Sequence, residues 1–81
     1  MINKEKFKSK LEALLDESYP NGEYRKMHYL AVEGRVRETM HRYVQENYAE
    51  YYGDNLSQLY KERDLLLEQC LVELSVPKKK H

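Results

Sequence analysis

The feature that most constrains this fold is a long helical pattern in the middle of the chain. Between about residues 23 and 52, apolar side chains recur at the spacing of one helix face, and no proline interrupts them. This face carries Tyr29, Val32, Val36, Met40, Tyr43, Val44 and Tyr51. Gly53 then offers a left-handed helix end, whereas Gly34 costs the interior about 1 kcal/mol relative to alanine and would mark a bend or a close helix approach. The helix would measure about 45 Å, too long for its shorter neighbours to cover.

Two shorter helices are predicted on either side of this segment. The first spans residues 4–18, with Asn3 as its cap, and ends at Tyr19 because a residue before proline disfavours the helical region. The second spans residues 56–75, with Asn55 and Gln58 at the spacing of a capping box. At about 1.5 Å per residue, these helices would be about 22 Å and 30 Å long.

Short turns make consecutive helices antiparallel, so the sequence predicts an all-α fold of three helices with a long central one. The two flanking helices would overlap only near residues 33–40, which leaves a thin core and half-covered apolar stripes. We therefore expect dimerisation or a partner to complete the fold. Residues 1–76 would form a single domain, and residues 77–81 a disordered basic tail.

Composition narrows the class of function. The 81 residues carry a formal net charge of zero, which argues against a dedicated polyanion binder. The single cysteine, Cys70, excludes an intramolecular disulfide framework, and no apolar run is long enough to cross a membrane. A cytoplasmic protein without membrane contact is the natural expectation.

The back of the last helix carries an unexpected apolar pair. Leu65 and Val72 are seven residues apart and lie about 180° from the main apolar stripe of that helix. They are either scattered surface hydrophobes, which are common, or a seam for a partner helix or a second copy of the chain. The thin predicted core favours the seam.

Tyrosines gather near the turn between the second and third predicted helices. Tyr43, Tyr51 and Tyr60 are predicted to point inward at the edge of the core. Tyr48 and Tyr52 lie toward the flank, beside the acidic side chains of Glu46 and Glu50. Aromatic residues are frequent in protein–protein hot spots, so this acidic flank is a candidate contact for a basic protein surface. The alternative is that these tyrosines are structural.

Basic residues suggest a second kind of partner. On a continuous helix, Arg25, Arg35 and Arg42 would follow one line, as in a stripe that tracks phosphates. The competing interpretation is a solvated helix with pairs of opposite charge four residues apart, such as Glu33 with Arg37. One further arginine, Arg63, falls inside the apolar stripe of the last helix, where we expect it to stack on Tyr43 or Tyr60 and reach water.

No pattern in the chain predicts catalysis. His28 and His41 are too far apart on one helix to share a metal ion, and Cys70 falls on the apolar stripe. We therefore expect no enzyme, cofactor or metal. The leading hypothesis is a small non-enzymatic regulatory protein, expected to form a homodimer, that binds a larger protein through Glu46, Tyr48, Glu50, Tyr52, Leu65 and Val72. The alternative is a nucleic-acid-binding accessory protein that uses Arg25, Arg35 and Arg42.

Overall fold

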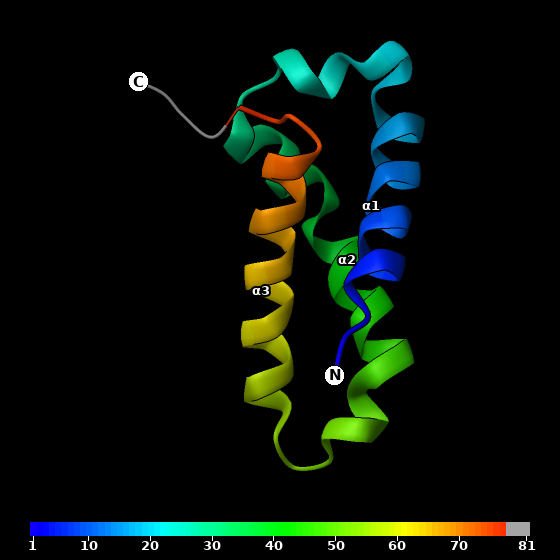
Figure 1. Cartoon of the computed structure of the whole chain (residues 1–81), viewed down its shortest axis with the longest axis vertical. Coiled ribbons are helices and arrows are strands. Elements are labelled where there is room, and N and C mark those ends of the chain that lie inside the picture. Colours follow the sequence, from blue (N-terminus) through cyan, green and yellow to red (C-terminus); the bar gives the residue numbers. More distant parts are fainter. Residues whose placement is uncertain (78–81) are drawn as a thin grey trace.

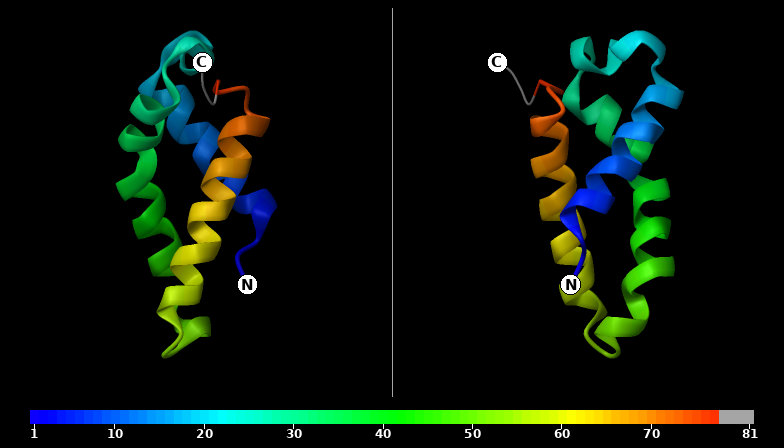
Figure 2. Two further views of the ribbon diagram at one scale, coloured as in Figure 1. Left: turned by 90° about the vertical axis from the view of Figure 1, so that its left-hand side faces the viewer. Right: turned by 45° about the vertical axis from the view of Figure 1, so that its right-hand side comes forward.

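The computed structural model describes residues 1–77, and in this range it is all-α, as predicted. The elements are the α-helices α1 (Lys4–Ser18), α2 (Tyr29–Tyr52) and α3 (Leu56–Glu73), with a 3-10 segment η1 (Pro20–Lys26) between α1 and α2. Helices α2 and α3 form an antiparallel hairpin, and α1 crosses it obliquely (Figures 1 and 2). The tail predicted to be disordered spans residues 77–81, of which residues 78–81 lie outside the described residues.

The first helix begins and ends as predicted. The side chain of Asn3 caps α1 by accepting a hydrogen bond from the backbone N–H of Lys6 at 3.0 Å. The helix stops at Tyr19, before Pro20, and the chain then turns through Asn21 and Gly22, both with positive φ. Glycine adopts positive φ without strain, and asparagine tolerates it better than most residues.

The central helix differs from the prediction, because it begins at Tyr29 and not near residue 23. Residues 20–26 form η1 instead, and Met27 is extended. A continuous helix would place Tyr24 on the outer face, about 140° from the centre of the core stripe. The break allows the ring of Tyr24 to be fully buried, which contributes about 2–3 kcal/mol, and His28 then caps α2 by accepting the N–H of Leu30.

Only some of the features predicted for the hairpin turn and for α3 are observed. Gly53 ends α2 with a positive φ of 55°, as expected for glycine at this place. The predicted capping box of Asn55 and Gln58 is wrong, because the Asn55 side chain caps no N–H and the Gln58 amide binds Glu62 at 3.2 Å. Helix α3 also ends at Glu73, two residues earlier than predicted.

The core is longer than the thin zone that the sequence predicted near residues 33–40. All three helices contribute side chains with almost no exposure: Phe7, Leu11 and Leu15 of α1, Val32, Val36, Met40 and Val44 of α2, and Leu59, Leu67, Cys70 and Leu71 of α3. Helix α1 packs against both hairpin helices because of its oblique crossing (Figure 2). Lys4 and Lys8 fasten it to α3 through ion pairs of 2.8 and 3.0 Å with Glu73.

Candidate functional site

The predicted apolar pair on the back of α3 is exposed. Leu65 is 59% exposed and Val72 is 48% exposed. Next to Leu65 is a surface hollow of about 270 Å³, lined by Met1, Ile2, Glu62, Leu65, Leu66 and Gln69. Met1 is itself 92% exposed. We call Leu65, Val72 and this hollow the α3 outer face. It combines the N-terminal residues with one side of a helix far along the chain.

Two of the predicted contact tyrosines form hydrogen bonds within the molecule, next to the α3 outer face. The Tyr48 hydroxyl accepts a hydrogen bond from the backbone N–H of Asn3 at 3.3 Å. The Tyr52 hydroxyl donates a hydrogen bond to the carboxylate of Glu62. Tyr48 and Tyr52 are half-buried, and both pack against the core. They therefore join α2 to the N-terminal segment and to α3.

The contact between Tyr52 and Glu62 changes the acidity of both groups. Burial, followed by the hydrogen bond to Glu62, raises the pKa of Tyr52 to about 12. The hydrogen bond donated by Tyr52 lowers the pKa of the Glu62 carboxyl below its ordinary value. The pair is therefore held in its neutral phenol and ionised carboxylate form at neutral pH.

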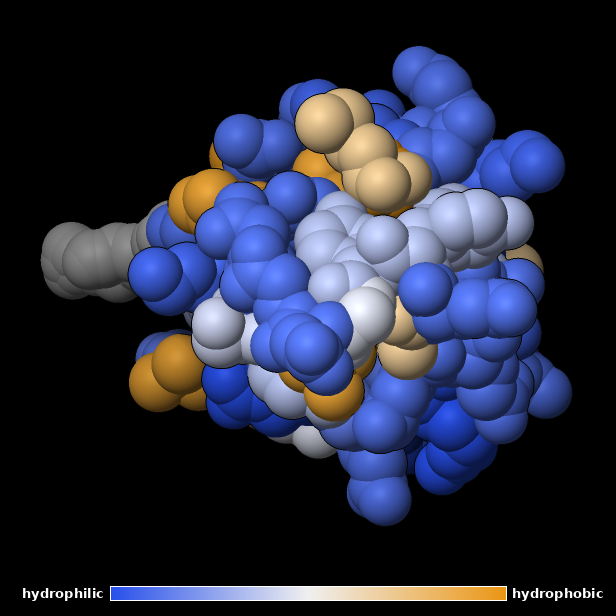
Figure 3. Space-filling model, turned by 90° about the horizontal axis from the view of Figure 1, so that it is seen from below, coloured by the Kyte–Doolittle hydropathy of each residue, from blue (hydrophilic) through white to orange (hydrophobic). Residues whose placement is uncertain are grey.

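Near the turn between α2 and α3, the position of one tyrosine differs from the prediction. Tyr51 is 78% exposed, although the apolar pattern predicted that it points inward. It lies in the last turn of α2, beyond the start of α1, so α1 does not cover it (Figure 1). Glu46 and Glu50 are also exposed. The view from this end shows small separate hydrophobic areas in a largely hydrophilic surface (Figure 3).

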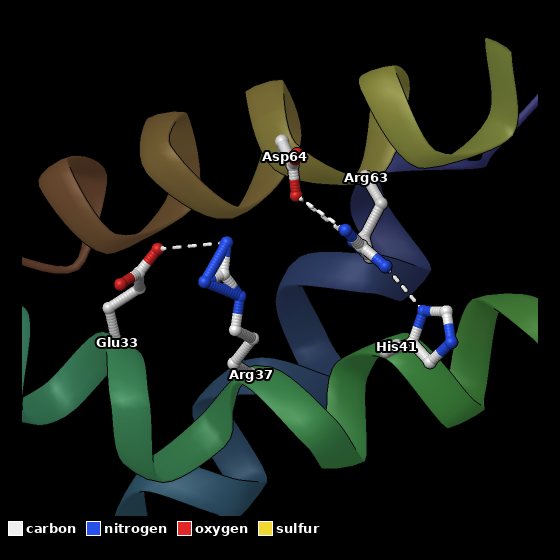
Figure 4. A network of polar contacts seen from close by, with 5 residues as sticks. All are labelled: Glu33, Arg37, His41, Arg63 and Asp64. Atoms are coloured by element: carbon white, nitrogen blue, oxygen red, sulfur yellow. Dashed lines mark hydrogen bonds and ion pairs between the residues drawn. The ribbon is translucent and has the colours of Figure 1, made fainter. Parts of the chain in front are cut away.

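A second group of polar side chains lies between α2 and α3 (Figure 4). The guanidinium of Arg63 stacks over the ring of Tyr60, one of the two rings predicted, at 5.2 Å. The side chain is only 13% exposed, so it reaches water less than the sequence predicted. Its Nε and Nη2 donate to Oδ1 of Asp64, at 3.1 and 2.8 Å. Its Nη1 contacts Nδ1 of His41, which the sequence did not predict. This contact depends on the register between α2 and α3, which no local pattern in the sequence fixes.

Arg63 and His41 border an open surface hollow of about 310 Å³, which we call the α2–α3 hollow. It is lined by Gly34, Arg37, Glu38, His41 and Arg63. A Cβ atom added to Gly34 would meet nothing within 4 Å, so this glycine does not serve a close helix approach. Arg37 is 53% exposed and lies 3.9 Å from the carboxylate of Glu33. That distance is too long for a hydrogen bond.

The basic residues proposed for nucleic acid do not form one line. Arg25 belongs to η1, where its guanidinium lies 4.7 Å from the Tyr24 ring. Arg35 lies over the ring of Tyr19 at 5.6 Å. Arg42 borders a separate hollow of about 100 Å³, lined by Lys10, Thr39, Arg42, Tyr43 and Glu46. The single stripe was predicted for a continuous helix. It does not form, because Met27 is extended and separates Arg25 in η1 from Arg35 and Arg42 in α2.

Residues 1–77 contain no candidate metal centre, since no group of three or more His, Cys, Asp or Glu side chains in this range could hold an ion. No helix in the same part of the chain is long and apolar enough to cross a membrane. Cys70 is a buried free thiol, as predicted, and burial raises its pKa. The chain matches no protein-family model, no curated protein and no solved structure.

Proposed function

We propose that this chain is a small non-enzymatic interaction protein that regulates a larger protein by binding it. The observation that carries the proposal is the α3 outer face, where Leu65 and Val72 remain exposed although the core buries the opposite side of the same helix. An apolar face beside a hollow is a typical place for the side chains of a partner protein. The natural occupant is one amphipathic helix, because the two residues are two helical turns apart.

The other predicted contact residues take secondary parts in this proposal. Tyr48 and Tyr52 already have intramolecular hydrogen-bond partners, so a binding partner gains less from their hydroxyls. Glu46 and Glu50 are exposed and remain available to basic side chains of a partner. Leu65 and Val72 therefore supply the apolar contact of this proposal, and Glu46 and Glu50 are separate exposed carboxylates on α2.

The test compares three forms of the full chain in affinity capture from an extract of the source cells. We expect the unmodified chain to retain a defined protein, and Leu65→Glu/Val72→Glu to lose it. Leu30→Glu is the matched control, because Leu30 is 66% exposed on α2 and lies outside the α3 outer face. Equal retention by all three forms, or retention of nucleic acid alone, would remove the proposal.

A second copy of the chain is one candidate partner. In that case the protein is a homodimer, and light scattering on a gel-filtration peak should give twice the monomer mass. Leu65→Glu/Val72→Glu should return it to the monomer. A monomer mass at high concentration for the unmodified chain would exclude the homodimer while leaving a different protein as partner.

We also propose that this interaction takes place in the cytoplasm, in keeping with a single reduced cysteine that is buried in the core. Fluorescence of a tagged chain in the source cells tests this location. A signal confined to the cell surface or to the medium would contradict it.

Nucleic-acid binding is a second proposal with less support, and it rests on Arg35, Arg42 and Lys10 along the α1 side of α2. Arg35 and Arg42 are exposed, and Lys10 and Arg42 border the same small hollow. If phosphate contacts drive binding, Arg35→Ala/Arg42→Ala should weaken it for all sequences and flatten its salt dependence. Fluorescence anisotropy with duplex DNA at about 50 mM salt is the measurement, because electrostatic association is strong there. No binding at this salt concentration would remove the proposal.

A further inference from the structure

The α2–α3 hollow brings two arginines from facing helices to one opening. Arg37 comes from α2 and Arg63 from α3, and both line the hollow (Figure 4). We propose that this hollow binds a phosphate group carried by a small ligand or by a phosphorylated side chain. Its volume of about 310 Å³ is at the lower end for small-ligand pockets.

The first support is the number of hydrogen-bond donors left over. A guanidinium has five N–H groups. Arg63 uses three of them, one on Nε and one on Nη2 for Asp64 and one on Nη1 for His41. Arg37 is only loosely paired, since Glu33 lies 3.9 Å away. Two donors of Arg63 and those of Arg37 can therefore serve a ligand, and arginine is well suited to phosphate oxygens.

The second support is the way in which Arg63 is held. Its side chain is largely buried, and three neighbours fix the guanidinium: the ring of Tyr60, the carboxylate of Asp64 and Nδ1 of His41. His41 also contacts the Tyr60 ring, with a centroid distance of 5.2 Å. A donor that is already fixed loses little conformational entropy when a ligand binds. His41 is thus a positioning residue for Arg63.

The acidic neighbours decide which anion the hollow can take. Glu38 lines the opening, and Glu33 and Asp64 are paired with its two arginines. These three carboxylates outnumber the two arginines, so a ligand must displace Glu33 from Arg37 in order to bind. A phosphate monoester carries about 1.5 to 2 negative charges and three acceptor oxygens, so it can replace the loose contact of Glu33 with Arg37. The proposal is therefore for phosphate and not for a simple carboxylate.

The test is an NMR titration of the full chain with inorganic phosphate at constant ionic strength. We expect saturable shifts of the Gly34 amide and of the Nε–H groups of Arg37 and Arg63, while acetate at the same ionic strength gives none. O-phosphoserine distinguishes the two sources: tighter binding than free phosphate indicates a phosphorylated side chain, and equal binding indicates that the phosphate group alone is recognised. Both outcomes support the site.

A matched pair of variants locates the binding. Arg37→Gln should weaken phosphate binding about tenfold or more, which is the loss expected for one hydrogen bond to a charged group. Lys61→Gln, an exposed change on α3 at a residue that does not line the hollow, should leave it unchanged. The Gln variant of Arg37 keeps the fold because that side chain is 53% exposed. Shifts that never saturate, or saturation that survives Arg37→Gln, would overturn the proposal.

Discussion

Among the described residues, one buried side-chain polar atom has no hydrogen-bond partner, and it is the hydroxyl of Tyr24. Burial is also the main cause that raises the pKa of this phenol. An unsatisfied buried group costs about 1–3 kcal/mol. We therefore predict that Tyr24→Phe raises the free energy of unfolding by about 1 kcal/mol, whereas Tyr24→Ala lowers it by about 3–5 kcal/mol because it leaves a cavity. Urea denaturation measures both, and a Phe variant less stable than the original chain would contradict this account.

Gly34 offers a second stabilising change at the scale of one residue. It lies inside α2, and a Cβ atom there meets only open space. Since glycine costs a helix interior about 1 kcal/mol relative to alanine, Gly34→Ala should raise the free energy of unfolding by about that amount. Ala13→Gly on the exposed side of α1 is the reverse control and should lower it by a similar amount. A destabilised Gly34→Ala chain would show that α2 needs its glycine.

The pair of Tyr52 and Glu62 makes stability depend on pH in a defined direction. The pKa of Tyr52 is raised from 10.0 to about 12, so its contribution is complete below pH 10 and is lost as the pH rises to about 12. Tyr52→Phe should therefore flatten the fall in unfolding free energy between pH 10 and 12. It should also raise the pKa of Glu62, because the phenol's hydrogen bond is the main cause that lowers it.

The control for this pair is Tyr51→Phe, because Tyr51 is 78% exposed and lies one residue away. It should leave the pKa of Glu62 unchanged. Titration followed by NMR of the Glu62 side chain gives the values. The same Glu62 pKa in the original chain and in Tyr52→Phe would show that the hydrogen bond does not form in solution.

At the scale of the helix, two asparagines at equivalent positions should differ in effect. Asn3 caps α1 with its side chain, but Asn55, in front of α3, makes no such bond. Asn3→Ala should therefore lower the free energy of unfolding by about 1 kcal/mol, the usual value for a lost N-cap, and Asn55→Ala by clearly less. Thermal or urea unfolding compares the two. Equal losses would mean that Asn55 also caps its helix.

The ends of the helices show what a sequence pattern can predict. Local signals at Asn3, Tyr19-Pro20 and Gly53 predicted their boundaries correctly, because each acts within a few residues. The start of α2 could not be predicted in this way. It depends on the burial of Tyr24 in the core, which is a tertiary effect, and on a histidine cap that is not among the preferred cap residues.

In the candidate sites too, some features follow from local sequence patterns and others depend on tertiary contacts. The exposure of Leu65 and Val72 followed from helical spacing alone. Tyr60 was one of the two rings on which Arg63 was expected to stack. The contact of Arg63 with His41 required the register of the hairpin, which a turn of uncertain length does not fix. The roles of Tyr48 and Tyr52 required the position of the N-terminal residues, which carry no pattern of their own.

At the scale of the whole molecule, α2 sets the length. Its 24 residues measure about 36 Å, close to the 39 Å of the longest dimension. The core is closed by α1 crossing both hairpin helices, so folding does not require Leu65 or Val72. We predict that Leu65→Glu/Val72→Glu changes the free energy of unfolding by no more than about 0.5 kcal/mol per substitution, as is usual for surface positions. A large loss of stability would mean that the α3 outer face supports the fold.

The central claim is that the α3 outer face binds a protein, and site-specific photo-crosslinking tests it most directly. A benzophenone amino acid is placed at position 65 of the full chain, and at position 12 on the exposed side of α1 as the control. After irradiation in an extract of the source cells, we predict a discrete protein adduct from position 65 that Val72→Glu abolishes, and none from position 12. Adducts of equal yield from both positions, or none from position 65, would contradict the claim.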